Sequence, residues 1–141
     1  MSDSTLDVLV VDDDELTAEV LERAIKKVSG DFRIVVANDG RDGLDVLYGK
    51  TDRRVARPFV ILLDLNMPTM NGFEFLEELR KSPNIRDSIV FVLTTSDADS
   101  DRSKAYHELI AGYMVKSAVG PQFSRLAVML QQYAAAVRLP E

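Results

Sequence analysis

The sequence predicts an α/β fold, a doubly wound five-stranded parallel sheet with helices on both faces. Two observations predict it. Short runs rich in β-branched residues alternate along the chain with longer segments of helical spacing. Several of these runs are almost continuously apolar, which is typical of strands that are buried on both faces. Repeated strand–helix units with right-handed crossovers build a parallel sheet covered by helices.

Five runs are the expected strands. The first, third and fourth are nearly all apolar, whereas the second and fifth are more mixed. Buried parallel strands have this continuous apolar character because neither face meets water. In chain order, the expected strands are Leu6–Val11, Phe32–Val36, Phe59–Leu63, Ile89–Leu93 and Gly112–Val115.

The first two helices are expected in the segments that follow the first two strands. The first starts after Asp14, and its apolar residues recur at helical spacing. The second covers about Arg41 to Tyr48. We expect the buried face of the first helix to carry Leu16, Val20, Ala24 and Val28.

The last three helices are marked by residues that suit helix starts. Asn71 is a favourable N-cap for the third, which buries Phe75, Leu76 and Leu79. The fourth begins in the acidic stretch from Asp97 to Asp101, whose carboxylates favour the positive end of a helix dipole. Pro121 fits the first turn of the fifth.

The composition limits the function. The 141 residues fit one domain, expected over residues 1–141 without an effector domain. With no cysteine and one histidine, thiolate and poly-His metal sites are excluded. A net charge of -6 argues against a nucleic-acid partner. The chain lacks an apolar run of the roughly 20 residues that a membrane helix needs. Its polar N-terminal residues are unlike a signal peptide. We therefore expect a cytoplasmic location and no membrane partner.

Polar side chains follow four of the five expected strands. Asp12, Asp13 and Asp14 follow the first, and Asp64 follows the third. Thr94 ends the fourth and Lys116 follows the fifth. Any one of these residues alone is most simply a cap, a turn residue or an exposed side chain. The carboxyl ends of parallel strands meet at one edge of a sheet, however, so we expect these groups to converge there.

The converging groups suit one reaction. Carboxylates gathered at one point repel each other unless a cation binds among them, and oxygen ligands without His or Cys favour Mg²⁺. A hydroxyl and an ammonium can bind the oxygens of an incoming phosphoryl group. A carboxylate can accept that group covalently. The pattern therefore predicts a Mg²⁺-dependent phosphoryl acceptor.

Four segments resemble the receiver domains of two-component response regulators. They are Val8–Asp14, Ile61–Gly72, Val92–Ser96 and Gly112–Lys116, in the order that the family shows. The resemblance implies a flavodoxin-like (CheY-like) sheet with strand order 2-1-3-4-5. It also implies phosphoryl transfer from a sensor histidine kinase, and signal output through an unidentified downstream protein.

The resemblance assigns an acceptor and a metal site. Asp64 occupies the position of the phosphoacceptor. Mg²⁺ would be held by Asp64, by the acidic pair Asp12 and Asp13, and by the backbone carbonyl of Asn66. Within the pair, Asp13 would bind the metal directly and Asp12 through water.

The resemblance also assigns groups that bind and sense the phosphate. Thr94, with Thr95 beside it, would supply the switch hydroxyl, Lys116 the phosphate-binding ammonium and Tyr113 the switch aromatic ring. The family usually has a proline after this lysine, joined by a cis bond, whereas Ser117 stands here. A cis bond before a non-proline residue costs about 3–4 kcal/mol, so we expect a trans bond and a differently shaped loop.

The spacing from Arg53 to Pro58 and the long fifth helix are more similar to regulators paired with bacterial phytochromes than to the chemotaxis regulator. This resemblance implies a bacteriophytochrome as the donor kinase and a tendency to dimerise. The fifth helix also carries apolar residues beyond one stripe, which favours burial on a second side. We therefore expect a homodimer through the fourth helix, fifth strand and fifth helix.

Three alternatives compete with this hypothesis. Asp12 to Leu16 approximates the first motif of haloacid-dehalogenase-like phosphatases, with Asp12 as nucleophile and Asp14 as acid/base. That enzyme needs an acidic motif after the lysine, where only Glu141 remains, and it leaves Asp64 unexplained. A nucleotide-binding fold is weakly supported because no glycine-rich phosphate loop follows a strand. A pseudo-receiver usually lacks an active-site residue, and none is lost here, but the departure at Ser117 keeps this alternative open.

Overall fold

The computed structural model describes residues 6–141, in which five parallel strands form one sheet of order β2-β1-β3-β4-β5. This confirms the predicted fold and strand order. Two strands are one residue longer than expected, β2 ending at Ala37 and β4 at Thr94. The strands are β1 (Leu6–Val11), β2 (Phe32–Ala37), β3 (Phe59–Leu63), β4 (Ile89–Thr94) and β5 (Gly112–Val115).

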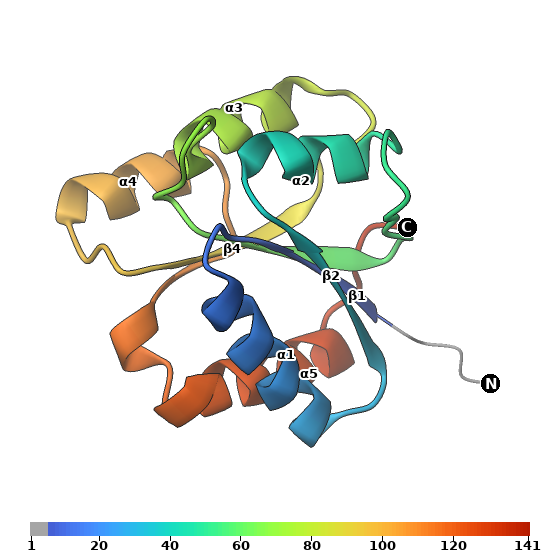
Figure 1. Cartoon of the computed structure of the whole chain (residues 1–141), viewed down its shortest axis with the longest axis vertical. Helices are drawn as coiled ribbons and strands as arrows, with labels where there is room; N and C mark the ends of the chain where they lie inside the picture. Colours follow the sequence, from blue (N-terminus) through green and yellow to red (C-terminus); the bar gives the residue numbers. More distant parts are fainter. Residues whose placement is uncertain (1–5) are drawn as a thin grey trace.

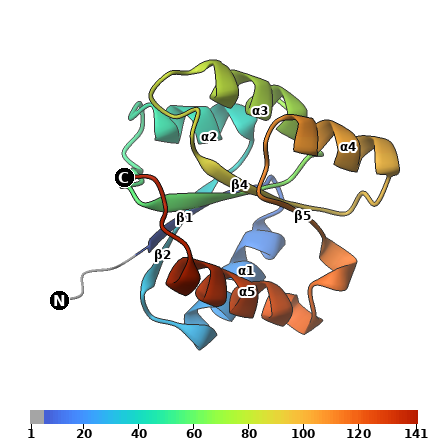
Figure 2. The same cartoon turned by 180° about the vertical axis from the view of Figure 1, so that it is seen from behind.

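Helices cover both faces of the sheet. The helices α1 and α5 lie on one face, and α2, α3 and α4 lie on the other (Figures 1 and 2). Within residues 6–141, no helix combines the length and the apolar character needed to span a membrane. The helices are α1 (Glu15–Val28), α2 (Gly40–Leu47), α3 (Gly72–Lys81), α4 (Asp99–His107) and α5 (Ser124–Ala136).

The sheet divides the core into two apolar clusters. Every residue of β1 and β3 is buried, because both strands have a neighbour on each side and helices on each face. Side chains alternate between the faces: Leu9 and Val11 pack under α2 and α3, whereas Val8 and Val10 pack against α1 and α5. The continuous apolar strands that predicted the fold are therefore the centre of the sheet.

The predicted buried face of α1 is wrong by part of a turn. Leu16 is 67% exposed, and Val20 and Val28 are only partly buried. The helix starts at Glu15 after the Asp14 cap, as expected, but its buried stripe combines i+3 and i+4 spacing, whereas the expected residues follow i+4 spacing alone. The residues that α1 buries are Thr17, Ala18, Leu21, Ala24 and Ile25.

The predicted position of Pro121 in the fifth helix is also wrong. Pro121 lies in a separate 3₁₀ turn, Pro121–Phe123, and α5 begins at Ser124. The backbone of Gln122 and Phe123 is left-handed, with φ values of 53° and 63°, so one continuous helix cannot run through them. This break lets Phe123 pack against the core cluster beneath α1 and α5.

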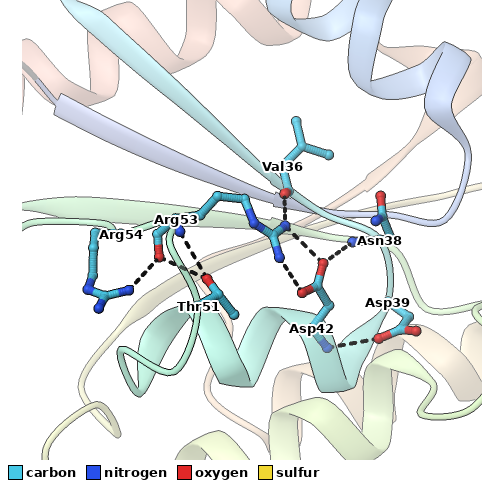
Figure 3. Close-up of polar contacts among 7 residues, drawn as sticks. All are labelled: Val36, Asn38, Asp39, Asp42, Thr51, Arg53 and Arg54. Carbon is cyan, nitrogen blue, oxygen red and sulfur yellow. Dashed lines mark hydrogen bonds and ion pairs between the residues drawn. The ribbon is translucent and has the colours of Figure 1, made fainter.

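A loop from Tyr48 to Pro58 leads into β3 and is held by polar contacts at the outer edge of β2 (Figure 3). The Arg53 guanidinium donates to both carboxylate oxygens of Asp42, at 2.9 and 2.5 Å, and to the backbone carbonyl of Val36 at 2.6 Å. The carboxylate of Asp42 also accepts from the Asn38 backbone N–H at 2.9 Å. Arg53 therefore occupies a carbonyl of an edge strand that would otherwise be free for other chains.

Candidate functional site

Three carboxylates meet where β1 and β3 end. One oxygen each from Asp12, Asp13 and Asp64 lies within 4.8 Å of the others. Asp12 and Asp64 are buried, with 4% and 6% of their surface exposed, whereas Asp13 is exposed. The two buried acids follow adjacent strands of the sheet, which explains how residues so far apart in sequence come together. The structure thus brings together the predicted acidic cluster.

The chain after β1 is shaped by two short-range hydrogen bonds. The Asp14 backbone N–H donates to Asp12 Oδ1 at 2.8 Å, which orients the Asp12 carboxylate. Asp14 itself accepts from the Leu16 N–H at 3.0 Å and from the Thr17 hydroxyl at 3.0 Å. Asp14 is therefore the N-cap of α1, as predicted, and its carboxylate is used in capping rather than in the cluster.

Lys116 supplies a positive charge to the two buried acids. Its Nζ atom lies 3.1 Å from Asp12 Oδ2 and 3.8 Å from Asp64 Oδ2. Its side chain is only 16% exposed, so these contacts are poorly screened by water. The ammonium thus lies where it can balance a charge that forms on Asp64.

The electrostatics of Asp12 favour a bound cation. Burial raises the pKa of the Asp12 carboxyl, and the nearby charge of Asp64 raises it further. The hydrogen bond from Asp14 and the ammonium of Lys116 act in the opposite direction, but burial is the larger effect. A divalent cation among the three carboxylates would stabilise their charged forms, and their hard oxygen atoms suit Mg²⁺ or Mn²⁺.

The loop after Asp64 passes very close to the start of α3. The Asn66 backbone N–H lies 3.4 Å from Asp64 Oδ1, and the Gly72 N–H donates to the Leu65 carbonyl at 3.0 Å. A Cβ atom on Gly72 would lie 2.6 Å from the Asp64 carbonyl oxygen and 2.7 Å from Leu65 Cα. Only glycine allows this approach, so Gly72 has a packing role at the start of α3.

Thr94 and Tyr113 are connected through Ser96. Thr94 is fully buried, and its Oγ1 atom lies 3.4 Å from the Ser96 backbone N–H. The Tyr113 hydroxyl donates to the Ser96 carbonyl at 2.9 Å, and burial raises its pKa. The ring is partly buried and packs against the core beneath α2 and α3. Thr95, in contrast, is exposed.

Ser96 has a larger structural role than the sequence indicated. Its hydroxyl donates to Asp101 Oδ2 at 2.6 Å, in the first turn of α4. A second contact between α4 and β5 was not predicted, in which the Tyr113 backbone N–H donates to the Tyr106 hydroxyl at 3.2 Å. Ser96 thus links the end of β4, the ring of Tyr113 and the start of α4. A serine two residues after a strand-ending threonine is too common a pattern to reveal these links.

The loop after Lys116 is trans, as expected from Ser117. Within residues 6–141, the cis peptide bond is that between Arg57 and Pro58. Residues Lys116–Ala118 form a short 3₁₀ turn, and the backbone turns again at Gly120, whose φ is 87°. The substitution of serine for proline therefore leaves Lys116 in contact with both buried acids.

The fold and the site define a class of flavodoxin-like α/β proteins with an acidic cluster and a lysine at the carboxyl edge of the sheet. A family model described as the response regulator receiver domain matches residues 8–127. The chain therefore belongs to the receiver-domain family of response regulators.

Solved structures of this family are similar to the chain in sequence and in fold. A two-component response regulator from Legionella pneumophila is 34% identical, with a TM-score of 0.80 over 94% of this chain and 99% of its own. Response regulator Rcp1 from Synechocystis sp. is 30% identical over 78% of this chain and 76% of its own. Its Mn²⁺-bound structure has a TM-score of 0.81 over 96% and 99% of the two chains. The phosphorylated cyanobacterial phytochrome response regulator RcpA is 26% identical, with a TM-score of 0.84 over 96% and 98%.

Proposed function

We propose that this chain is a single-domain response regulator in which Asp64 accepts a phosphoryl group from a sensor histidine kinase. The observation that carries the proposal is the arrangement around Asp64. Its buried carboxylate lies beside two further acids and 3.8 Å from the Lys116 ammonium. The chemistry of the chain would be limited to its own phosphorylation and dephosphorylation. The signal would pass to a downstream protein.

In the proposed transfer, a carboxylate oxygen of Asp64 attacks the phosphorus atom of a phosphohistidine. A P–O bond forms, the P–N bond breaks, and the released imidazole takes a proton from solvent. Charge then grows on the phosphoryl oxygens, and the Lys116 ammonium is already placed to stabilise it. The Thr94 hydroxyl would bind another of these oxygens, with exposed Thr95 beside it.

We infer that Mg²⁺ is the cofactor. Asp12, Asp13 and Asp64 offer three carboxylates, and the backbone carbonyl of Asn66 would complete the protein ligands. When bound, the metal supplies positive charge that orients the phosphoryl oxygens and neutralises them. The Mn²⁺-bound form of Rcp1 supports a divalent ion in a relative of this chain.

The response to phosphorylation would run through Ser96. A phosphate adds about -1.5 to -2 charge units, which attracts the Thr94 hydroxyl and Lys116. Movement of Thr94 would change the Ser96 segment, which the Tyr113 hydroxyl and Asp101 both contact. These contacts would couple the acceptor to α4 and β5.

Two finer proposals concern partners. The similarity to RcpA, a phytochrome response regulator, supports a bacteriophytochrome as the donor kinase. Exposed apolar side chains on α4, beside it and at the end of α5 support a homodimer through α4, β5 and α5: Tyr106, Leu109 and Val137. A monomer mass at micromolar concentration, with and without phosphodonor, would contradict the dimer.

The proposed chemistry is tested by labelling with radioactive acetyl phosphate. Label should appear only with Mg²⁺, resist acid, be lost in base, and be absent from the Asp64→Asn variant. The phosphatase alternative predicts a different residue dependence, because its nucleophile is Asp12 and not Asp64. Steady phosphomonoester turnover that survives Asp64→Asn but not Asp12→Asn would favour that enzyme. The structure offers the phosphatase little support, since Glu141 is at the chain end, away from the carboxyl edge of the strands (Figure 1).

A further inference from the structure

The helices α3 and α4 lie side by side on the same face of the sheet (Figures 1 and 2), and a groove lies between their side chains. Its space of about 150 Å³ is lined by Asn71, Phe73, Glu74, Glu77, Lys104 and Glu108. Asn71 and Phe73 also line a second hollow of about 460 Å³, which extends to Met67 and Asp101. The two hollows share Asn71 and Phe73 and so adjoin each other, and together they are called the groove.

The floor of the groove is apolar. Phe73 and Met67 are partly buried, and both pack against the core beneath α2 and α3. Their outer surfaces line the groove. The neighbouring helix α4 covers this floor poorly, because Ala105 is its single buried residue.

The walls of the groove are fixed by Arg80 on α3. Its guanidinium donates to the backbone carbonyls of Glu108 at 2.8 Å and Leu109 at 3.1 Å, where α4 ends. The same group donates to the Ser88 carbonyl at 2.9 Å, ahead of β4. These hydrogen bonds fix the distance between α3 and the end of α4, so the groove between the two helices is part of the folded structure.

The rim of the groove is acidic. Four carboxylates line it, and none of them forms an ion pair within the described part of the chain. They are Asp101, Glu74, Glu77 and Glu108. Asp101 and Glu74 accept hydrogen bonds from Ser96 and Asn71, whereas the carboxylates of Glu77 and Glu108 form no hydrogen bond or ion pair among residues 6–141.

The floor already holds one cation. The Nζ atom of Lys104 lies 4.3 Å from the centroid of the Phe73 ring, a cation–π contact. Lys104 and the Arg80 guanidinium near Glu108 are two cations against four carboxylates, so the groove keeps an excess of negative charge. The contact shows the chemistry that this surface accepts, which is a cation over an aromatic ring with carboxylates around it.

We propose that the groove between α3 and α4 docks a segment of another protein that carries Lys or Arg beside an apolar residue. The apolar residue contacts Phe73 and Met67, and the cations face Glu77 and Glu108. A second copy of this chain is a poor occupant, because it would bring a net charge of -6 to an acidic groove. The proposal does not depend on phosphorylation of Asp64.

The test uses a short fluorescein-labelled peptide of Leu, Lys and Ala, in which Leu and Lys recur at helical spacing. The control peptide has Glu in place of each Lys. Fluorescence anisotropy of the full chain should show binding of the first peptide alone, weakened by salt. The double variant Glu77→Gln/Glu108→Gln should weaken binding roughly five- to tenfold. Phe73→Ala should weaken it about two- to fivefold through the lost apolar contact with the peptide.

The matched control removes two carboxylates elsewhere. Glu19→Gln/Glu22→Gln on α1 changes the net charge equally but should leave the affinity unchanged, as should Asp64→Asn. Backbone amide shifts on peptide addition should map to α3 and α4. No binding at millimolar peptide, an equal loss in the α1 variant, or shifts confined to other helices would overturn the proposal. Self-association through α3 and α4 without peptide would also overturn it, in favour of a second copy.

Discussion

The Nζ atom of Lys116 lies 3.1 Å from Oδ2 of Asp12, although 104 residues separate the two in sequence. The sheet explains the contact, because β1 and β5 run parallel and end at the same edge, with β3 and β4 between them. The ammonium balances buried carboxylates before any phosphate arrives. Phosphorylation of Asp64 would give Lys116 a stronger partner and so redistribute charge in the site.

Removal of the Lys116 charge should slow phosphorylation far more than it affects folding. In Lys116→Met, the charge that develops on the phosphoryl oxygens loses its buried counter-charge. We expect the rate with acetyl phosphate to fall by about 10²–10³, as when one electrostatic stabiliser is removed from an active site. Single-turnover labelling measures this rate. Lys81→Met, which changes an exposed lysine at the end of α3, should react like the wild type, and equal rates in both variants would contradict the assigned role.

Mg²⁺ should stabilise the protein through the acidic cluster. At a Mg²⁺ concentration ten times Kd, the free energy of unfolding should rise by about 1.4 kcal/mol, and Asp12→Asn should gain less at the same concentration. Without metal, Asp12→Asn should be more stable than the wild type, because burial penalises the Asp12 charge. Urea unfolding at pH 7, with EDTA or with Mg²⁺, measures both the gain in stability from Mg²⁺ and the effect of Asp12→Asn without metal. Equal stabilisation of both proteins by Mg²⁺ would place the ion elsewhere.

Gly72 should tolerate no side chain. In Gly72→Ala, the new Cβ would meet the backbone of Asp64 and Leu65 at 2.6 and 2.7 Å, so the loop that carries the acceptor must shift. We expect a loss of about 1–3 kcal/mol in the free energy of unfolding and slower phosphorylation. Gly30→Ala is the matched control, since nothing lies within 4 Å of a Cβ at that position. Equal effects of the two substitutions would refute the close approach.

The contribution of Asp42 to stability should disappear in acid. Hydrogen bonds from Arg53 hold the pKa of the Asp42 carboxyl below 3.8, its ordinary value. When folding lowers the pKa of a carboxyl group, the charged group stabilises the folded protein. This stabilisation is complete above the pKa of the unfolded state and is lost as the pH falls through the pKa of the folded state. Asp42→Asn should therefore cost about 1–2 kcal/mol near neutral pH and progressively less below pH 3.8.

Urea titrations from neutral pH to about pH 2.5 measure this difference across the range in which carboxyl groups titrate. Asp52→Asn provides the control, because Asp52 is an exposed acid in the same loop. Its effect should be small at every pH. A cost for Asp42→Asn that stays constant down to the lowest pH would show that the pair with Arg53 does not lower the Asp42 pKa.

The sheet and the site were predictable because both depend on strand patterns and strand ends. Apolar runs located all five strands, and the residues after them included Asp12, Asp64 and Lys116. Parallel geometry then required those residues to meet at one edge. No contact of one particular side chain was needed for that inference.

The errors had different physical causes. The start of α1 after Asp14 was predicted correctly, but the expected apolar row followed i+4 spacing alone, which drifts around the helix, so it placed exposed Leu16 on the buried face. The late start of α5 depends on left-handed conformations at Gln122 and Phe123, which are unusual for these residue types. The links of Ser96 to Tyr113 and Asp101 required side-chain positions that no spacing reveals.

The central claim is that the phosphoryl group resides on Asp64. After reaction with acetyl phosphate and Mg²⁺, borohydride reduces an aspartyl phosphate to homoserine, and mass spectrometry of peptides locates the reduced residue. We predict homoserine at position 64 alone, none without Mg²⁺, and none in the Asp64→Asn variant. Homoserine at position 12 or 13 in the wild-type protein, with Asp64 unmodified, would contradict the account.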